Sequence, residues 1–349
     1  MQFSKPLAVY AVKDKDEEAL SRAASGGAFS VLARPIISLG GVVFGARTHD
    51  GGVVQHVTAE SLDEISQLQG SAYVQSDIEG TFQSIIEFLR DGRIVLFVGL
   101  PCQCAAVLSY VGAKLPKGLD SEKLFLCDLV CHGAPNDELF QAHQHWLARK
   151  RKSDDGIHSF QFRTKRKGWG LYYYYYYYYY RNGRKREVCE PGDSDPYYAA
   201  FLRGETYRES CYRCPFAKGE RVTDFTIGDY WGIESVHPEF YDSNGVSLLM
   251  LNSAKAMRYF EEYSSKECES IVSNMECAAK ENHNLNGPTE RPRSRDALLE
   301  AIASRRALGD LEAIFDTTLK PRMTFKRVVK RVLPASFYSA AKRIVKGGR

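Results

Sequence analysis

The sequence predicts an α/β fold: a mixed, partly parallel sheet with flanking helices, plus a smaller α+β C-terminal segment that closes a crevice at the edge of the sheet. Strand-like and helix-like patterns alternate over the first 150 residues. Within them, two continuous apolar runs, 93–100 and 123–130, flank a helical pattern. Near Ser153 the chain becomes basic and rich in tyrosine, which indicates a separate segment.

The first elements follow from caps and apolar spacing. We expect a strand over 7–12, a helix from its N-cap Ser25 to Gly40–Gly41, and a hairpin of strands over 42–47 and 51–59. Ser61 and Ser76 each fit the Ser-x-x-Glu capping box, so each is expected to begin a helix. The helix after Ser76 is amphipathic and should end near Gly92.

The two apolar runs predict a strand–helix–strand unit. Neither run alternates with polar residues, as is typical of strands buried on both faces. The unit is about 30 residues long, the size of a βαβ crossover, which makes its two strands parallel. Both strands would then end at one edge of the sheet, where open α/β sheets bind ligands.

The sequence after residue 153 predicts one long strand and several shorter elements. Nine consecutive tyrosines, Tyr172–Tyr180, precede an Asn-Gly turn and predict a strand whose rings alternately face core and solvent. Further along, we expect a strand over 246–252 and helices over 195–204, 255–263, 297–304 and 311–319. The predicted division of the chain is 1–152, 153–285 and a helical, basic tail over 286–349.

Composition and charge limit the possible functions. The net charge is +4, yet residues 320–349 hold ten Lys or Arg and no Asp or Glu, so the body is net acidic. A nucleic-acid partner is therefore not expected. The basic tail is either a solvated helix pair or a peripheral contact with an anionic membrane. The first residues lack the long apolar core of a signal peptide, and no run of eighteen apolar residues occurs. Because the nine cysteines are also an odd number, we expect a cytoplasmic protein with reduced thiols.

Four cysteines form a candidate metal site. Cys102 and Cys131 directly follow the two buried strands, so both should lie at one sheet edge. Cys211 and Cys214 have the Cys-x-x-Cys spacing at which two thiolates bind one centre. Four thiolates around one point suit a 4Fe–4S cluster or a structural zinc. Unliganded thiols, or a thioredoxin-like redox pair with a helix beginning at Pro215, are the alternatives.

The other five cysteines are assigned no role. Cys127 should point into the core and Cys104 lies just inside a helix, whereas Cys189, Cys268 and Cys277 show no metal-binding spacing.

A second candidate site lies at two helix starts. Ser25, Gly26 and Gly27 would let a phosphate approach backbone N–H groups, although an ordinary N-cap has the same pattern. The stretch 70–76 adds further polar groups: Gly70, Ser71, Tyr73, Gln75 and Ser76. Two such starts beside a strand-tip crevice suit a dinucleotide such as FAD. No G-x-G-x-x-G motif is present, so a standard Rossmann site is not expected.

Eight motifs together resemble the coenzyme F420 (deazaflavin) hydrogenase and dehydrogenase beta-subunit family, which includes 7-hydroxymethyl chlorophyll a reductase. They occur in the family's order over about residues 7–255: "SGGAFSVL", "GGVVFGA", "QGSAYVQSD", "VLFVGLPCQ", "DLVCHGAP", "FRTKRKGW", "SCYRCPFAKGERVTDFTIGDYWG" and "GVSLLMLNS".

The resemblance implies an iron–sulfur flavoprotein oxidoreductase. Residues 1–152 would bind FAD, and 153–285 would complete the cluster site and bind substrate. The implied cluster ligands are Cys102, Cys131, Cys211 and Cys214. The flavin would lie along 25–27, 70–76 and the turn containing Gly99, Pro101 and Gln103.

Several roles remain expectations. His132 is a tentative proton donor, with a supporting hydrogen bond as the simpler alternative. Asp229 and Trp231 are expected to shape the pocket, and the basic stretch 163–167 could attract an anionic substrate or an acidic ferredoxin. Many relatives begin with a two-cluster ferredoxin-like segment that this sequence lacks, so a separate ferredoxin-like electron donor is expected. The alternative is a non-catalytic electron-relay or scaffolding subunit, for example in bacterial glycan biosynthesis.

Overall fold

A single mixed sheet forms the centre of the molecule. The computed structural model describes residues 2–116, 121–304 and 308–319. Eight strands pair in the order β11-β1-β10-β9-β5-β4-β2-β3. Their bounds are β1 Ala8–Asp14, β2 Val42–Thr48, β3 Val54–Ala59, β4 Val95–Gly99, β5 Leu124–Leu129, β9 Phe225–Asp229, β10 Ser247–Leu251 and β11 Cys268–Ser273. Strands β2, β4, β5 and β9 are parallel, and the outer strands are antiparallel, which confirms the predicted mixed sheet.

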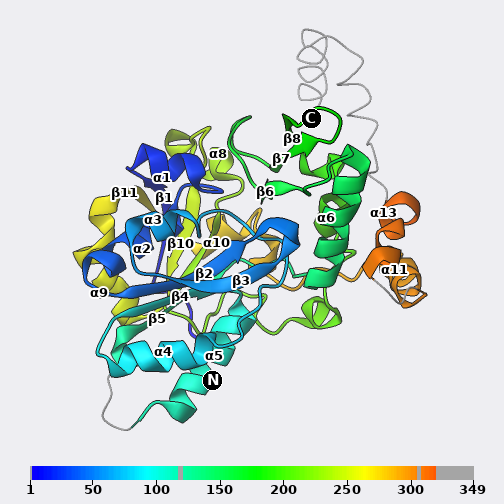
Figure 1. Ribbon diagram of the computed structural model, residues 1–349. Helices are drawn as coiled ribbons and strands as arrows, with labels where there is room; N and C mark the ends of the chain where they lie inside the picture. The colour runs from blue at the N-terminus through cyan, green and yellow to red at the C-terminus, as the bar shows by residue number, and fades with distance from the viewer. Residues whose placement is uncertain (1, 117–120, 305–307, 320–349) are drawn as a thin grey trace.

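Helices cover both faces of this sheet (Figure 1). Helices α2 (Ala28–Ser38) and α9 (Ala254–Glu262) pack on one face, where the core includes Leu32, Phe125 and Tyr259. Helices α4 (Thr81–Arg90) and α5 (Pro101–Lys114) pack on the other, around Ile85 and Phe97. The shorter helices are α1 Glu17–Arg22, α3 Leu62–Ser66, α8 Ile233–Val236 and α10 Met275–Ala279.

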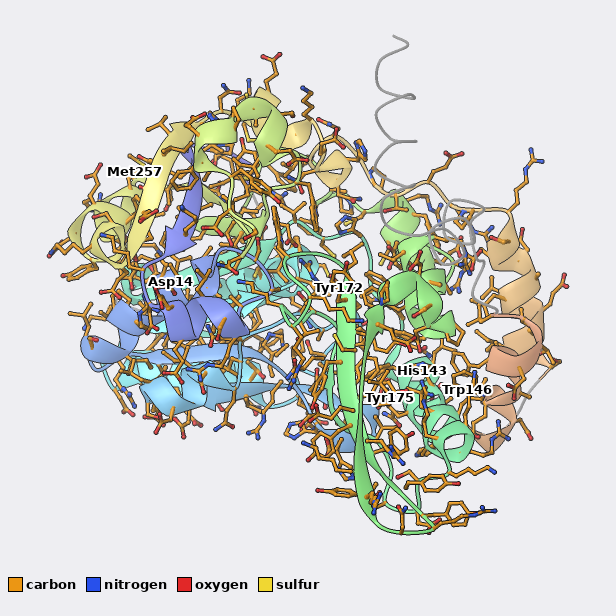
Figure 2. All side chains as sticks on the ribbon, turned by 90° about the horizontal axis from the view of Figure 1, so that it is seen from above. Asp14, His143, Trp146, Tyr172, Tyr175 and Met257 are labelled. Atoms are coloured by element: carbon orange, nitrogen blue, oxygen red, sulfur yellow. The ribbon has the colours of Figure 1, made fainter. Side chains whose placement is uncertain are left out.

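A second, smaller layer stands beside the sheet. Strands β6 (His158–Gln161), β7 (Tyr172–Tyr179) and β8 (Arg184–Pro191) form a three-stranded antiparallel sheet. It shares an aromatic core with α6 Asp137–Arg151, α7 Pro196–Leu202, α11 Ser294–Ala303 and α13 Ala313–Thr317, and α12 spans Leu308–Leu311. Figure 2 shows Tyr172 and Tyr175 on β7 next to His143 and Trp146 on α6, away from Asp14 and Met257 in the main sheet layer.

The tyrosine run forms the predicted strand and hairpin. Tyr173 and Tyr175 are buried against Phe160, as strand alternation requires. Tyr174 on the opposite face is buried as well, because the Arg166 guanidinium lies 4.0 Å from its ring centroid. The expected alternation is therefore correct only in part, since a cation covers one outward-facing ring.

Two predicted helix starts were wrong. Ser25 is not the N-cap of α2, because Gly27 takes that position in a left-handed conformation (φ 84°). Ser76 does not cap α4, whose N-cap is Gly80. The Ser61 capping box is confirmed. Strands β9 and β11 were not predicted, and the tail over 320–349 lies outside the described residues.

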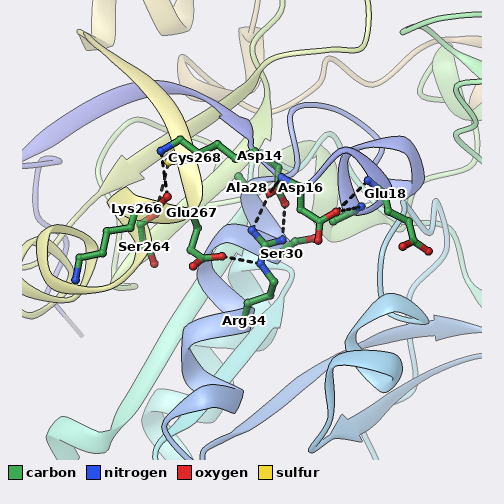
Figure 3. Close-up of polar contacts among 12 residues, drawn as sticks. Asp14, Asp16, Glu18, Ala28, Ser30, Arg34, Ser264, Lys266, Glu267 and Cys268 are labelled. Atoms are coloured by element: carbon green, nitrogen blue, oxygen red, sulfur yellow. Dashed lines mark hydrogen bonds and ion pairs between the residues drawn. The ribbon is translucent and has the colours of Figure 1, made fainter.

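An ion-pair network holds α2 against the sheet (Figure 3). Arg34 on α2 binds the buried Asp14 of β1 through two hydrogen bonds of 2.7 and 2.8 Å. The same guanidinium binds Glu267, just before β11, at 2.8 Å. Because planar, bidentate pairs of this kind hold both partners in one orientation, α2 is tied to two adjacent strands.

The main sheet contains strands from both sides of the predicted boundary at residue 152. Strands β1 to β5 precede it, and β9 to β11 follow it. The division into three parts therefore remains a prediction about function. Within the described ranges, no helix has both the length and the apolar character needed to cross a membrane.

Candidate functional site

Two cavities meet at the carboxyl ends of β4, β5 and β9. The larger has a volume of about 870 Å³, and its lining includes the start of α2, the stretch 66–74 and residues 159–166. The smaller is lined by all four candidate cysteines: Cys102, Cys131, Cys211 and Cys214. Leu100 and residues 131–134 line both cavities, so these two short segments form the wall between them.

Local structure accounts for the position of each cysteine. Cys102 is the second residue of α5, immediately after β4, and Cys131 lies two residues beyond β5. Strands β4 and β5 are parallel neighbours, as the sequence predicts, so these two thiols share one edge. Cys211 belongs to the short 3-10 helix Glu209–Arg213, and Cys214 follows it directly. No helix begins at Pro215, so the thioredoxin-like alternative lacks its expected geometry.

The electrostatics of the thiols reflect their clustering. Burial raises the pKa of the Cys131 thiol to about 12, together with the smaller effect of the nearby thiols Cys102, Cys211 and Cys214 and against a backbone hydrogen bond from Gly133. The pKa of Cys102 is also raised by burial, and the positive charge of Arg208 opposes this shift. Ionising several buried thiols close together costs free energy, because burial and mutual repulsion both oppose the negative charge. The positive charge of a bound metal centre would offset this cost.

The candidate donors of the small cavity are thiols, which suit either an iron–sulfur cluster or a single ion with sulfur ligands. Four half-buried cysteines line the small cavity, and no carboxylate does. Among the residues that the structure describes, no group of three or more His, Cys, Asp or Glu is placed to hold one metal ion. A cubane cluster holds its thiolates farther apart than a zinc ion does, because each sulfur binds a different iron.

The remaining cysteines lie elsewhere. Cys104 and Cys127 are buried in the core, as expected for Cys127. Cys189, Cys268 and Cys277 do not line the small cavity. None of the nine cysteines forms a disulfide in the structure, whose described residues include all nine.

Most of the predicted flavin residues line the large cavity. These are Ser25, Gly27, Gly70, Ser71, Tyr73, Ser76, Gly99 and Gln103, together with His132. Three do not: Gly26, Gln75 and Pro101. The backbone N–H of Gln75 instead bonds to Pro135 at 3.0 Å, and Pro101 lines the cysteine cavity. The volume is within the range of about 300–1,000 Å³ that is typical of cofactor sites.

The start of α2 could bind an anion, but Ser25, Gly26 and Gly27 have different roles there. The Ser25 hydroxyl donates to the Val246 carbonyl at 2.7 Å, so it is already engaged within the protein. A Cβ at Gly26 would lie 2.2 Å from the Val12 carbonyl oxygen, so Gly26 allows two backbones to approach closely. Gly27 lines the cavity and precedes the N-terminus of an 11-residue helix, where backbone N–H groups favour negative charge.

A chain of hydrogen bonds links Gln103, Ser76 and His56. The Gln103 amide donates to the Ser76 hydroxyl at 3.0 Å, and that hydroxyl contacts His56 Nδ1 at 2.9 Å. His56 Nε2 contacts the Val98 carbonyl at 2.9 Å, which requires a proton on Nε2. Burial lowers the pKa of His56 to about 4. His56 also lines the large cavity, and sequence reasoning missed it because nothing near it in sequence identifies its partners.

A buried ion pair shapes the opposite wall. Arg163 and Asp229 form two hydrogen bonds of 2.9 Å, and the indole N–H of Trp169 donates to Asp229 at 2.8 Å. Trp231 stacks on Trp169 with ring centroids 5.0 Å apart. This agrees with the expectation that Asp229 and Trp231 shape the pocket, and it shows that Arg163 is internally paired.

Lys165 belongs to the same wall. Its hydrogen-bond partners among the described residues are carbonyl oxygens, not carboxylates. Its ammonium donates to the carbonyls of Leu20 and Ser25, the latter at 2.6 Å. Burial, followed by the charge of Arg163, lowers its pKa to about 8. Lys165 therefore brings positive charge next to the start of α2.

His132 lies in the segment that both cavities share. Its side chain is accessible from the cavities, and its carbonyl accepts a hydrogen bond from the Thr289 hydroxyl at 2.8 Å. The surrounding protein lowers the pKa of its imidazole by burial, against the charge of Asp229.

Comparison with known proteins agrees with the sequence motifs. The family described as the C terminus of the coenzyme F420 hydrogenase/dehydrogenase beta subunit matches residues 92–274, which is more than half of the chain. The chain belongs to this family. Its membership indicates a redox, electron-transfer role and confirms the predicted resemblance.

The fold is similar to that of a solved structure. A chain of the F420-reducing [NiFe] hydrogenase complex from Methanosarcina barkeri, studied by xenon derivatization, matches with a TM-score of 0.50 and 14% identity. The match covers 85% of this chain and 92% of that one. It confirms the α/β fold class. No curated protein sequence matches the chain.

Proposed function

We propose that the chain is an iron–sulfur flavoprotein oxidoreductase. It would pass electrons between a 4Fe–4S cluster, held by Cys102, Cys131, Cys211 and Cys214, and FAD in the large cavity. A small molecule bound beside the flavin would be the substrate, and a ferredoxin-like protein the electron donor. The redox role follows from the family, whereas the two cofactors, the donor and the residues are our proposal.

The observation that carries the proposal is the wall between the two cavities. Residues 131–134 line both of them, and Cys131 is one of the four thiols. Leu100 lines both cavities as well. A centre bound by the thiols and a planar cofactor in the large cavity would thus lie on opposite sides of one thin wall of protein. Such proximity supports electron transfer between them.

When bound, the cluster would supply one-electron transfer and the flavin one- or two-electron transfer, with the protein providing position and electrostatics. Gly27 and the start of α2 would bind a cofactor phosphate, and Lys165 would add a positive charge there. Gln103 and Ser76 would present a fixed polar surface at the strand tips. His132, accessible from both cavities, would move a proton to or from the substrate.

The test is purification without oxygen, followed by iron, zinc and flavin analysis. We expect one FAD and about four irons per chain, as a single cubane cluster requires. Changing Cys102, Cys131, Cys211 or Cys214 to Ser should reduce the iron content at least several-fold. Cys277→Ser is the matched control, because Cys277 is half-buried and does not line the cavity.

Three outcomes would contradict the proposal in different ways. Zinc without flavin would indicate a scaffolding module. A cluster without flavin would favour the non-catalytic relay subunit. Equal iron loss in Cys277→Ser and Cys102→Ser would show that the four thiols are not a distinct ligand set.

A further inference from the structure

An arginine in the cysteine cavity has an unused hydrogen-bond donor. Arg208 lines this cavity together with the four thiols. Its Nε is buried, and within the described part of the chain it has no hydrogen-bond partner. A buried donor without a partner is costly, so native proteins rarely keep one without a function.

The backbone fixes Arg208 at this point. Its N–H donates to the carbonyl of Ala134 at 3.0 Å, and its carbonyl accepts the N–H of Cys211 at 2.9 Å. Ala134 belongs to the wall between the two cavities, and Cys211 is a candidate ligand. Arg208 is thus joined by main-chain bonds to both sides of the proposed electron path.

Arg208 lies in the small cavity with the four thiols and without an acidic side chain in the lining. The lining of the small cavity contains no Asp or Glu, so no carboxylate there competes for the guanidinium. Hydrogen bonds to the sulfurs and nearby charge are two of the means by which a protein sets the reduction potential of a cluster. Both would come from this one side chain.

We propose that Arg208 raises the reduction potential of the cluster by donating its Nε–H to a cluster sulfur and by placing a positive charge beside it. This inference rests on the proposed function. Reduction by one electron, supplied by the external donor, adds one negative charge at the cluster and breaks no bond. Arg208 stabilises that added charge, so it favours the reduced state.

Arg208→Gln and Arg213→Gln make a matched comparison. Arg213 is exposed, lies between Cys211 and Cys214 in sequence, and does not line the cavity. Both variants remove one positive charge near the same thiols. The measurement is an anaerobic titration of the full-length protein with dithionite, following the paramagnetic signal of the reduced cluster. We expect a clearly lower midpoint potential for Arg208→Gln and a much smaller shift for Arg213→Gln.

A third variant, Arg208→Lys, still tests the role of the Nε–H if Arg208→Gln loses its iron. Arg208→Lys retains a positive charge but has no Nε–H, and its potential should also lie below that of the wild type. A wild-type potential in the iron-bearing variants, or an equal shift in Arg213→Gln, would overturn the role of Arg208 alone. A wild-type protein without any cluster would instead overturn the proposed function and this inference with it.

Discussion

At the scale of single residues, the large cavity depends on groups that are held in one protonation state. His56 is enclosed by the Val98 carbonyl, the Ser76 hydroxyl and the ring of Phe97, which stacks on it at 4.8 Å. Both ring nitrogens are engaged, one as donor and one as acceptor. Burial favours the neutral imidazole over the charged one, and in the neutral form Nδ1 accepts from the Ser76 hydroxyl while Nε2–H donates to Val98.

His56 should make the stability of the protein sensitive to acid. The unfolded chain binds a proton at this residue below about pH 6.5, whereas the folded protein does so only near pH 4, despite the opposing charge of Asp77. Above pH 6.5, His56 is neutral in both states and does not oppose folding. As the pH falls from 6.5 toward 4, the unfolded chain gains a proton that the folded protein does not, so the folded protein loses stability. We expect the stability advantage of wild type over His56→Gln to shrink by about 2–3 kcal/mol between pH 7 and pH 4.5. Urea unfolding at several pH values measures this, and a constant difference would contradict it.

The Arg163–Asp229 pair is a second residue-scale feature, since Arg163 is 4% exposed. Asp229→Leu would leave a buried guanidinium without its carboxylate, at a cost of about 3–5 kcal/mol in unfolding free energy. The double variant Arg163→Met/Asp229→Leu should lose less than Asp229→Leu alone, because no charge is then left unpaired. Urea unfolding of the wild type, these two variants and the single variant Arg163→Met completes the double-mutant cycle. Additive losses would show that the two side chains are not coupled.

At the scale of elements, the position of α2 depends on close backbone contact. Gly26 lies between β1 and β10, where an added Cβ would meet the Val12 carbonyl oxygen at 2.2 Å and the Ser247 nitrogen at 2.4 Å. Neither atom belongs to a flexible side chain, so the backbone itself would have to move. The start of α2 is therefore placed by packing, and the Arg34–Asp14 pair then holds its orientation.

Gly26→Ala should be destabilising by about 2–4 kcal/mol, as for other substitutions that overpack a core. Gly112→Ala in α5 is the control, because an added Cβ there meets nothing within 4 Å. In a helix that change is expected to stabilise by about 0.5–1 kcal/mol. Thermal or urea unfolding measures both variants. Similar effects of the two substitutions would refute the close-contact role of Gly26.

At the scale of the whole molecule, the main sheet joins distant parts of the chain. Strand β1 is paired with β10 and β11, and β5 is paired on one side with β9. All three partners follow residue 152. The cavities lie at strand ends contributed by both halves, so the site depends on the complete sheet.

A fragment of residues 1–152 should therefore not fold alone. It keeps β2 to β5 but leaves β1 without either neighbour and exposes the edge of β5. We expect it to lack the cooperative urea transition and the near-ultraviolet circular dichroism of the full chain. A cooperative transition in the fragment would instead support an independent domain ending at residue 152.

Local signals explain which features the sequence could predict. The runs 93–100 and 123–130 are mostly apolar, and a cysteine follows each within two residues, so the strand-tip position of the two cysteines follows from neighbouring residues. Strand β9 gives a weaker signal, because its five residues Phe225–Asp229 include a glycine and end in an aspartate. The start of α2 was misplaced because a serine followed by two glycines matches several caps, and only packing selects Gly27.

The sequence by itself determined the α/β class, the parallel βαβ unit and the four cysteines as a candidate set, because apolar runs, turns and spacing act over short distances along the chain. Only the tertiary structure decided that His56 meets Ser76, that Arg163 pairs with Asp229, and that Arg208 lines the same cavity as the four thiols. These contacts join residues that are up to about a hundred positions apart. Their formation depends on how the whole sheet is assembled, which no local pattern encodes.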